Sequence, residues 1–187
     1  MSLITPHGGK LVNRQLDPNT AKAAEGAAGS LPAVTLSSRE ACDLEMIAIG
    51  AFSPLEGFMG QADFTGVCKD MRLASGTVWP IPVVLSPAND VAEEINPGQQ
   101  IALKDGKGRL MAVMTVKEKY RHDKALEIPN VYRTEDEKHP GVAIVKSQGD
   151  WCLGGPVDVI NANYEPEFPD FRLPPAKTRE AFVAKGW

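Results

Sequence analysis

Apolar residues recur at helical spacing in the segment "TLSSREACDLEMIAIG". Ser37 followed three residues later by Glu40 fits a capping box, in which each side chain satisfies a backbone amide at the helix start. Gly50 suits the helix end, because glycine adopts the left-handed conformation at little steric cost. The pattern therefore predicts a helix between Ser37 and Gly50. Its apolar face carries Ala41, Leu44, Ile47 and Ala48.

The next segment, "AFSPLEGFMG", is apolar but is interrupted by proline and glycine. Ser53 followed by Pro54 repeats a helix-start signal, and Glu56 could reach back as the capping partner of Ser53. Because Gly57 follows so soon, about one helical turn is expected. The whole stretch from Leu44 to Gly60 is interpreted as a packed joint, and not as a catalytic loop. The joint would pack Phe52, Leu55 and Phe58.

Two further segments on the amino-terminal side have helical features. The alanine-rich segment from Asp17 to Ser30 predicts either a short, weak helix or a surface loop. A second helix is predicted from about Asp63, where four residues recur at helical spacing. These residues are Phe64, Val67, Cys68 and Met71.

After Gly76 the composition changes to one typical of strands. "TVWPIPVVLS" predicts an edge or bulged strand, because its two prolines cannot donate to a ladder. "QQIALKDGKGRLMAVMT" predicts two strands joined by a turn at Asp105-Gly106. "GVAIVKSQGDWCLGGPVDVIN" predicts a short strand or helix, then two strands flanking Gly154-Gly155. Helices followed by strands with short turns indicate an α+β domain with a curled sheet or small barrel.

Length and charge narrow the class of protein. The 187 residues suit one domain, or one domain and the start of another. A net charge of -4 gives no general attraction to nucleic acid or anionic membranes. No apolar run approaches the length of a membrane-spanning helix, and "MSLITPHGGK" lacks the features of a signal peptide. The protein is therefore expected in the cytoplasm, with no membrane partner.

Cysteines and histidines do not form a recognisable metal or disulfide pattern. The three cysteines, Cys42, Cys68 and Cys152, are sparse and widely spaced, which favours reduced thiols. The three histidines are too far apart in sequence to indicate a local metal site. His122 lies in the basic segment "KEKYRHDK", where it could contact a phosphate or nucleic acid; a solvated strand end is the favoured interpretation. His7 and His139 are expected in turns.

Short motifs for phosphate or metal binding are equally weak. "HGGK" at 7–10 and "DGKGR" at 105–109 lack the spacing of a P-loop or a dinucleotide fingerprint, so a flexible amino-terminal turn and a hairpin turn are favoured. The acidic residues 135–137 are consecutive and would point in different directions, as in a solvated turn. No serine has the flanking glycines of a nucleophile elbow. Neither catalytic, cofactor-binding nor metal-binding residues are assigned.

Five segments nevertheless occur in the order found in one enzyme family. They are "PHGGKLV", "LSSREACDLEMIAIGAFSPLEGFMG", "MRLASGTVWPIPVVL", "EDEKHPGV" and "PPAKTREAFVAKGW". Over nearly its whole length the chain resembles the amino-terminal part of sulfate adenylyltransferase (ATP sulfurylase). The block from Arg39 to Gly60 is the most specific part of this resemblance.

The resemblance implies an α+β fold, a β-rich PUA-like pseudo-barrel with flanking helices, over residues 1–167. Residues 168–187 would be a connector and first helix leading to a catalytic domain. The family's enzymes join ATP and sulfate to give adenosine 5'-phosphosulfate and pyrophosphate, or run the reverse reaction, and Mg-ATP is expected for the full-length enzyme. Their catalytic motifs Q-x-R-N-P and H-x-x-H do not occur here, and Asn96-Pro97 lacks the preceding arginine.

The chain is therefore predicted to be a structural, accessory domain that binds no cofactor itself and is inactive alone. The resemblance implies two partners: the catalytic domain of the same enzyme and, at full length, further copies in a homo-oligomer. Apolar residues at 52–59 and 164–171 are candidates for such contacts. A second hypothesis is a stand-alone PUA-like module that binds RNA, with Tyr120 available for base stacking. The acidic net charge argues against a nucleic-acid partner.

Overall fold

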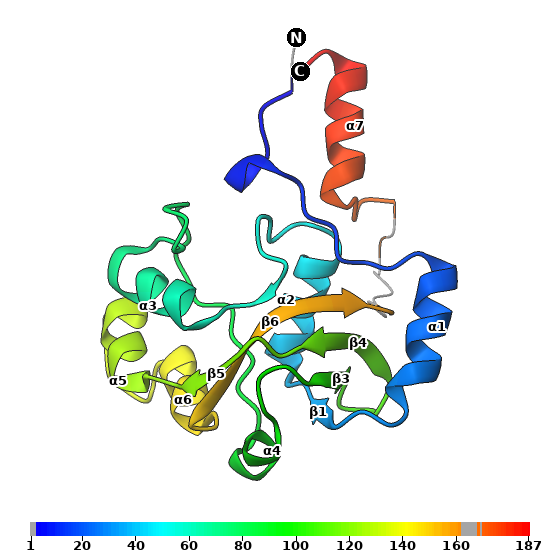
Figure 1. Cartoon of the computed structure of the whole chain (residues 1–187). Helices are drawn as coiled ribbons and strands as arrows, with labels where there is room; N and C mark the ends of the chain where they lie inside the picture. Colours follow the sequence, from blue (N-terminus) through cyan, green and yellow to red (C-terminus); the bar gives the residue numbers. More distant parts are fainter. Residues whose placement is uncertain (1–2, 162–167, 169) are drawn as a thin grey trace.

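The chain folds around one curled sheet, shown in Figure 1 as a computed structural model that describes residues 3–161, 168 and 170–187. The strands run in the order β1-β3-β4-β6-β2, and β5 also pairs with β6. β1 and β3 are parallel, and the other pairs are antiparallel. This sheet with its flanking helices confirms the predicted α+β class. The strands are β1 Ala33–Thr35, β2 Gly57–Phe58, β3 Gln100–Lys104, β4 Leu110–Thr115, β5 Glu118–Arg121 and β6 Trp151–Val159.

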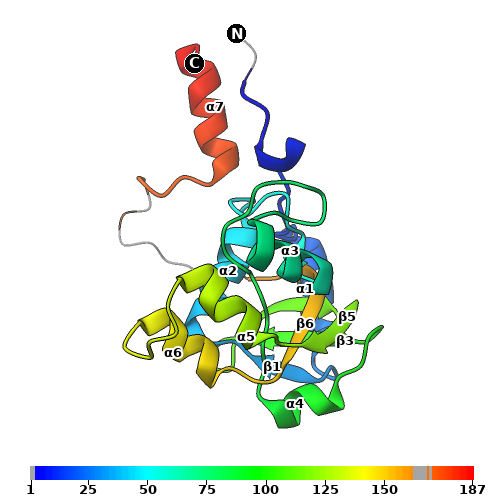
Figure 2. The same cartoon turned by 90° about the vertical axis from the view of Figure 1, so that its left-hand side faces the viewer.

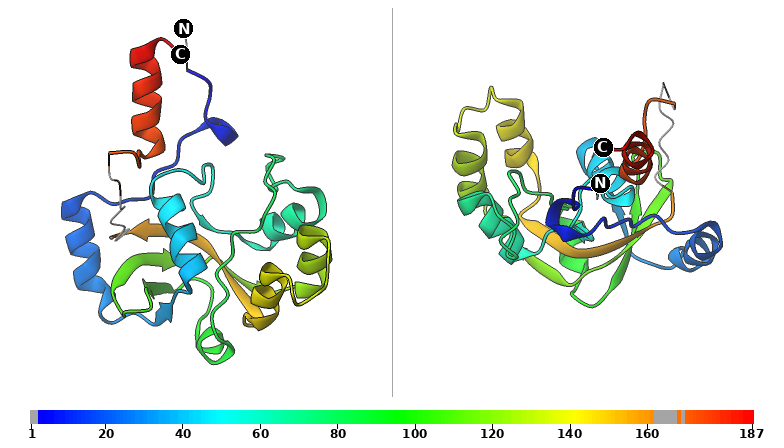
Figure 3. Two further views of the ribbon diagram at one scale, coloured as in Figure 1. Left: turned by 180° about the vertical axis from the view of Figure 1, so that it is seen from behind. Right: turned by 90° about the horizontal axis from the view of Figure 1, so that it is seen from above.

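Helices flank the sheet on two sides and at one end. Figures 1 and 2 show α3, α5 and α6 on one side, whereas α1 lies on the opposite side in Figure 3. The short turn η1 and helix α7 stand at the same end as both chain termini. The helices are η1 His7–Gly9, α1 Pro18–Ala28, α2 Ser38–Ala48, α3 Gln61–Asp70, α4 Asn89–Glu94, α5 Lys124–Glu127, η2 Ile128–Tyr132, α6 Pro140–Ser147 and α7 Pro175–Lys185.

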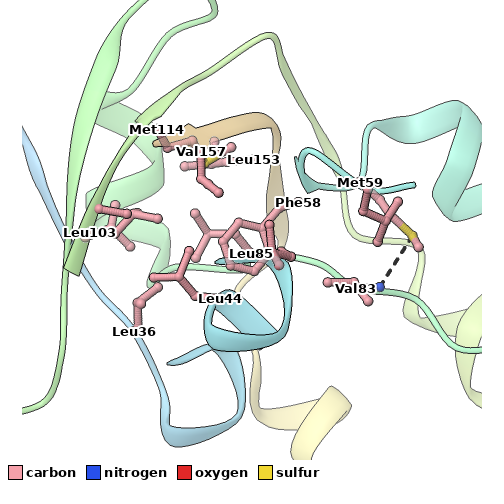
Figure 4. Close-up of a cluster of buried hydrophobic side chains, with 14 of the residues drawn as sticks. Leu36, Leu44, Phe58, Met59, Val83, Leu85, Leu103, Met114, Leu153 and Val157 are labelled. Carbon is pink, nitrogen blue, oxygen red and sulfur yellow. Dashed lines mark hydrogen bonds between the residues drawn. The ribbon is translucent and has the colours of Figure 1, made fainter. Parts of the chain in front are cut away.

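The helix α2 forms as the sequence predicts. The Glu40 amide donates to Ser37 Oγ at 3.3 Å, and the Ser37 amide donates to Glu40 Oε2 at 2.8 Å, which completes the capping box. Leu44 and Ile47 are fully buried against the sheet, and Gly50 has a φ of 83° just beyond the helix end. The helix therefore delivers its apolar face to the main core, which Figure 4 shows together with Phe58 and Leu85.

The joint after α2 is packed as predicted, but the expected helical turn at 53–56 is wrong. Ser53 Oγ donates to the carbonyl of Gly50 at 2.6 Å and accepts from the amide of Val12 at 2.8 Å. The hydroxyl thus ties the amino-terminal segment to the end of α2, and it does not start a new helix. Glu56 is exposed, so its expected role as a capping partner is also wrong. Phe58 is 3% exposed and lies in strand β2.

Two expectations about strands are also wrong. Residues 77–86 are not a strand; only Val78 and Leu85 make isolated bridges, and Pro80 and Pro82 lack the amides for a ladder. The two strands predicted around Gly154-Gly155 are one strand, β6, that runs through both glycines. The strand continues through Gly154 and Gly155 because neighbouring backbones approach closely there, and glycine has no side chain to block them.

Two segments for which the sequence left alternatives open are both helical. The alanine-rich segment forms α1, capped by Asp17, and "GVAIVKS" lies in helix α6. The helix predicted from about Asp63 is α3, but it ends one residue before Met71, which is half exposed in a left-handed conformation. The hairpin between β3 and β4 is confirmed. Residues 162–167 of the connector lie outside the described part of the chain.

The buried ring of Phe58 provides a test of the joint. Phe58→Ala is expected to lower the free energy of unfolding by about 3–5 kcal/mol, because it leaves a cavity between the sheet and α2. Urea denaturation followed by circular dichroism measures the loss. Phe182→Ala is the matched control, since its ring in α7 is 43% exposed and a change within about 0.5 kcal/mol is expected. Equal stabilities for the Phe58 variant and the wild type would contradict the packed joint.

Candidate functional site

His122 lies in the core, so the favoured interpretation of this residue as a solvated strand end is wrong. Its Nε2 is hydrogen-bonded to Glu127 Oε2 at 2.7 Å, and both side chains are fully buried. The amide of His122 donates to the carbonyl of Asp150, which seats the residue beyond the end of β5. The rings of Phe64 and His122 pack nearly perpendicular to each other, with a centroid distance of 5.8 Å. The sequence signal that was missed is Glu127, five residues away in the first turn after β5.

Ser86 extends this pair into a serine-histidine-glutamate row, but the row is structural. Ser86 Oγ lies 3.5 Å from His122 Nδ1, at the limit of a hydrogen bond. The same hydroxyl donates to the carbonyls of Gly149 and Trp151 at 3.2 and 3.1 Å. Because a nucleophile must give its proton to the neighbouring base, this geometry does not suit serine catalysis. The row instead links α5 to the segment before β6.

Tyr120 is buried as well, so its expected availability for base stacking is wrong. The phenol donates to the carbonyl of Met59 at 2.9 Å, and burial raises its pKa. The aromatic side chain beside the basic residues of β5 is Trp151, whose ring already lies against Arg121 and Lys119. These positions remove the stacking residue on which the RNA hypothesis relied.

The cysteines are free thiols, as predicted. Burial raises the pKa of both the Cys68 and Cys152 thiols to about 12, which keeps them protonated and unreactive. Cys42 is exposed on α2. In the described residues, no cluster of three or more histidines, cysteines and acidic residues is arranged to hold a metal ion.

The short motifs have ordinary structural roles. In "HGGK", His7 Nε2 is hydrogen-bonded to the carbonyl of Val78 at 2.7 Å, so the predicted turn is docked on another segment. In "DGKGR", Asp105 accepts from the amides of Lys107 and Arg109, which closes the predicted hairpin turn. The acidic residues 135–137 are exposed, as expected, and His139 caps α6. No helix in the part of the chain described here has both the length and the hydropathy to cross a membrane.

The best-formed pocket lies where three distant segments meet, and it measures about 550 Å³. Its walls are mostly apolar, with the edge of one aromatic ring packed on the face of another, Phe52 and Trp79, at a centroid distance of 5.6 Å. Ile81 is 51% exposed at the pocket. Two charged residues from α2, Arg39 and Asp43, lie in the lining, and His7 comes from η1.

Asp43 is the unusual group in this pocket. Burial raises the pKa of its carboxyl to about 6, although Arg39 opposes the shift. The nearest Arg39 nitrogen, Nε, lies 3.8 Å from Asp43 Oδ2, and Arg39 donates instead to the carbonyl of Pro82 at 3.1 Å. Asp43 Oδ2 is buried without a hydrogen-bond partner. The pocket lining contains no serine, threonine, cysteine or lysine, so the pocket has the character of a binding site and lacks a nucleophile.

The sequence shows the spacing of Arg39 and Asp43, four residues apart on one helix, but not the pocket. The other walls come from segments far away in sequence, around His7 and Trp79. Nothing in the local pattern of α2 marks Asp43 as a buried carboxylate. The sequence alone therefore does not predict this pocket.

Comparisons with known proteins agree with this fold. The profile of a family described as PUA-like domain matches residues 4–162. Curated relatives named sulfate adenylyltransferase include those of Synechococcus sp. (strain JA-3-3Ab), 44% identical, and Symbiobacterium thermophilum, 48% identical. Each matches 184 residues, or 98% of this chain and 47% of the relative, so the chain spans about half the length of the curated relatives it matches.

The backbone of this chain is also similar to that of a solved structure. The chain is similar to a protein described as hexameric APS kinase from Thiobacillus denitrificans, with a TM-score of 0.75 and 32% sequence identity. The similarity covers 99% of this chain and 32% of that one. Both comparisons support the PUA-like pseudo-barrel that the sequence resemblance implied.

The pKa of Asp43 predicts an unusual pH dependence of stability. Between its usual value of 3.8 and the folded-state value of about 6, the folded protein holds a proton that the unfolded chain has lost. Stability therefore falls as pH rises through this window. Above about pH 6 the ionised carboxylate costs the fold up to about 3 kcal/mol. Asp43→Asn is expected to raise the free energy of unfolding by about 1–3 kcal/mol near pH 7, and by little near pH 4.

Urea denaturation at the two pH values measures this effect. Asp70→Asn is the matched control, since Asp70 is an exposed carboxylate on α3. A variant at Asp43 that is less stable than the wild type at neutral pH would contradict the assigned cause.

Replacing the buried carboxylate of Glu127 is expected to destabilise the protein, which is the opposite of the result expected for Asp43. Glu127→Ala is expected to lower the free energy of unfolding by about 3–5 kcal/mol, because it leaves a fully buried imidazole without its partner. Glu137→Ala is the control: Glu137 pairs with Lys146 at the surface, where an ion pair contributes about 0–1 kcal/mol. If both variants lost the same small amount in thermal denaturation, the buried pair would not stabilise the core.

Proposed function

The chain belongs to the PUA-like domain family, and on this premise we propose that it is the accessory, non-catalytic domain of a sulfate adenylyltransferase. The full-length enzyme would bind Mg-ATP and convert ATP and sulfate to adenosine 5'-phosphosulfate and pyrophosphate, or run the reverse reaction. One observation carries the proposal: 98% of the chain matches enzymes of that name at 44–48% identity, yet it spans about half their length.

The chemistry of the described residues supports an accessory role. Ser86 and His122 have structural hydrogen bonds, and the best-formed pocket contains no nucleophile. The catalytic motifs that the resemblance implies for the family do not occur in the sequence. In this proposal the missing chemistry belongs to the other half of the enzyme.

Helix α7 supports a partner at the end of the molecule where both termini lie (Figure 2). None of its 11 residues is buried, and Phe182 and Val183 are 43% and 59% exposed. Because isolated helices of this length are only marginally stable in water, α7 is expected to need a covering surface. We propose that residues 1–167 form the accessory domain. Residues 168–187 would then be the connector and first helix, covered by the catalytic domain.

The predicted contact residues divide into two groups. Leu55, Phe58 and Met59 are buried in the core of this domain, so these three do not provide an exposed contact surface. Phe52 is half buried and lines the pocket. Phe168 and Phe171 are 64% and 87% exposed and fit a partner surface, whereas Tyr164 lies outside the described residues. The similar solved protein is described as hexameric, which supports a homo-oligomer at full length as part of the proposal. We propose that the full-length protein is a cytoplasmic enzyme of sulfate assimilation.

The accessory role predicts that the isolated chain is inactive. Purified chain, incubated with Mg-ATP and sulfate, should release no pyrophosphate above background. The enzyme of Symbiobacterium thermophilum serves as the positive control in the same assay. Pyrophosphate release that depends on both substrates, from this chain alone, would overturn the proposed division of roles.

A chimera tests the positive side of the same proposal. Replacing the matching part of the Symbiobacterium thermophilum enzyme by this chain should give a folded enzyme that retains activity, since the two are 48% identical. A folded but inactive chimera would argue that the domain does not serve this enzyme.

A further inference from the structure

Exposed apolar side chains gather at the end of the molecule where both chain termini lie. In the part of the chain that the structure describes, all the exposed large apolar residues except Ile144 belong to four segments. These are the amino-terminal segment, the loop at 71–81, the connector and α7. Figures 1 and 3 show them at one end of the molecule, whereas Ile144 belongs to α6. Such a concentration of exposed apolar surface usually marks a place that a partner covers.

The loop at 71–81 follows α3 and is a fixed part of the fold despite its exposure. The amide of Trp79 donates to the carbonyl of Met71 at 2.8 Å, which closes the loop on itself. The side chains of Val78 and Ile81 are each 51% exposed at the edge of the apolar pocket. Because the loop already holds one shape, a partner that covers it has little conformational entropy to remove.

The amino-terminal segment joins this loop to α7. His7 is hydrogen-bonded to the carbonyl of Val78, and Arg179 of α7 donates to the carbonyl of Ile4. A second apolar groove, with the ring of Phe182 in its lining, lies between the amino-terminal segment and α7. The segments therefore form one continuous surface, which we call the terminal face. It consists of residues 3–9, 71–81 and 175–187.

The positions of the two termini point to the partner of the terminal face. The curated relatives are about twice as long as this chain, so an enzyme of their length has another half joined at one of the termini. Both termini lie at the terminal face (Figure 1). Whichever terminus is used, the other half starts there and is held close to this surface at a high effective concentration.

We propose that the terminal face, including the pocket between Phe52, Trp79 and Ile81, is the docking surface for the other half of the enzyme. Apolar side chains of that half fill the pocket and cover the loop at 71–81, and the removal of both surfaces from water favours the contact. The inference rests on the proposed function, from which it takes the partner. It extends the contact from the connector and α7 to a part of the sequence about 100 residues away.

Hydrogen exchange of the loop tests the proposal in the chimera with the Symbiobacterium thermophilum enzyme. Backbone amides at 71–81 should exchange about tenfold more slowly in the folded chimera than in this chain alone, because the docked half keeps water from them. Amides of α6 should exchange at equal rates in both proteins. Equal rates at 71–81 would overturn the proposal. A chimera with the Synechococcus relative serves if the first one does not fold.

Pyrophosphate release by the same chimera separates this proposal from the proposed function. An active chimera whose loop at 71–81 is unprotected would overturn the docking surface and leave the proposed function standing. A folded, inactive chimera whose loop is protected would count against the proposed function and support the docking surface.

Ile81→Asp is the decisive variant, and Ile144→Asp is its matched control. The two isoleucines are 51% and 45% exposed, so neither change should lower the melting temperature of this chain alone. In the chimera, Ile81→Asp should return the exchange at 71–81 to the rate in the chain alone, because docking would bury the new charge. Ile144→Asp should leave that exchange slow. Equal exchange at 71–81 in the two variant chimeras would overturn the proposal.

Other occupants of the terminal face would give different results in the same experiment. A contact within one chain gives protection that does not depend on protein concentration. Protection at 71–81 that appears only as the chimera is concentrated would identify a second copy as the occupant and overturn the proposal. Protection that appears only when phosphatidylcholine vesicles are added would identify a lipid surface and overturn it as well.

Discussion

Close contact between backbones at strand β6 is the constraint on which the sheet depends. A Cβ atom on Gly57 would lie 2.0 Å from the carbonyl oxygen of Gly155, and one on Gly155 would lie 2.1 Å from that of Thr115. These distances are far below van der Waals contact, so β2, β6 and the end of β4 can meet only without side chains at these positions. Strand β6 pairs with β4 and also with β2 and β5, so it joins β2 and β5 to the rest of the curled sheet. The core under α2 and the joint after it rest on this arrangement.

Local signals were sufficient for the parts of the fold that local contacts hold. The capping box of Ser37 and Glu40 and the turn at Asp105 use partners within four residues, and both were predicted. Ser53 was misread because one of its partners, the amide of Val12, lies 41 residues away. His122 was misread because the basic letters around it suggested solvent, whereas the elements packed against it exclude water. Such long-range contacts leave little trace in the local pattern of residue types.

The candidate site also depends on contacts between segments that are far apart in the sequence. Each wall of the pocket has an ordinary local explanation, as helix, joint or proline-rich segment, and only the tertiary fold brings Asp43 together with Trp79 and His7. The resemblance to a known family helped with the fold, because whole segments are preserved in order. It did not help with the pocket, because the catalytic motifs that the resemblance implies do not occur in this sequence.

The two buried carboxylates, Glu127 and Asp43, differ in how closely a partner is held. Glu127 is fully buried; His122 hydrogen-bonds its Oε2, whereas its Oε1 has no hydrogen-bond partner. Asp43 is less deeply buried, its charged neighbour Arg39 lies at the longer distance of 3.8 Å, and burial raises the pKa of its carboxyl to about 6. A domain whose only task was to hold a shape would gain stability from an uncharged residue at this position.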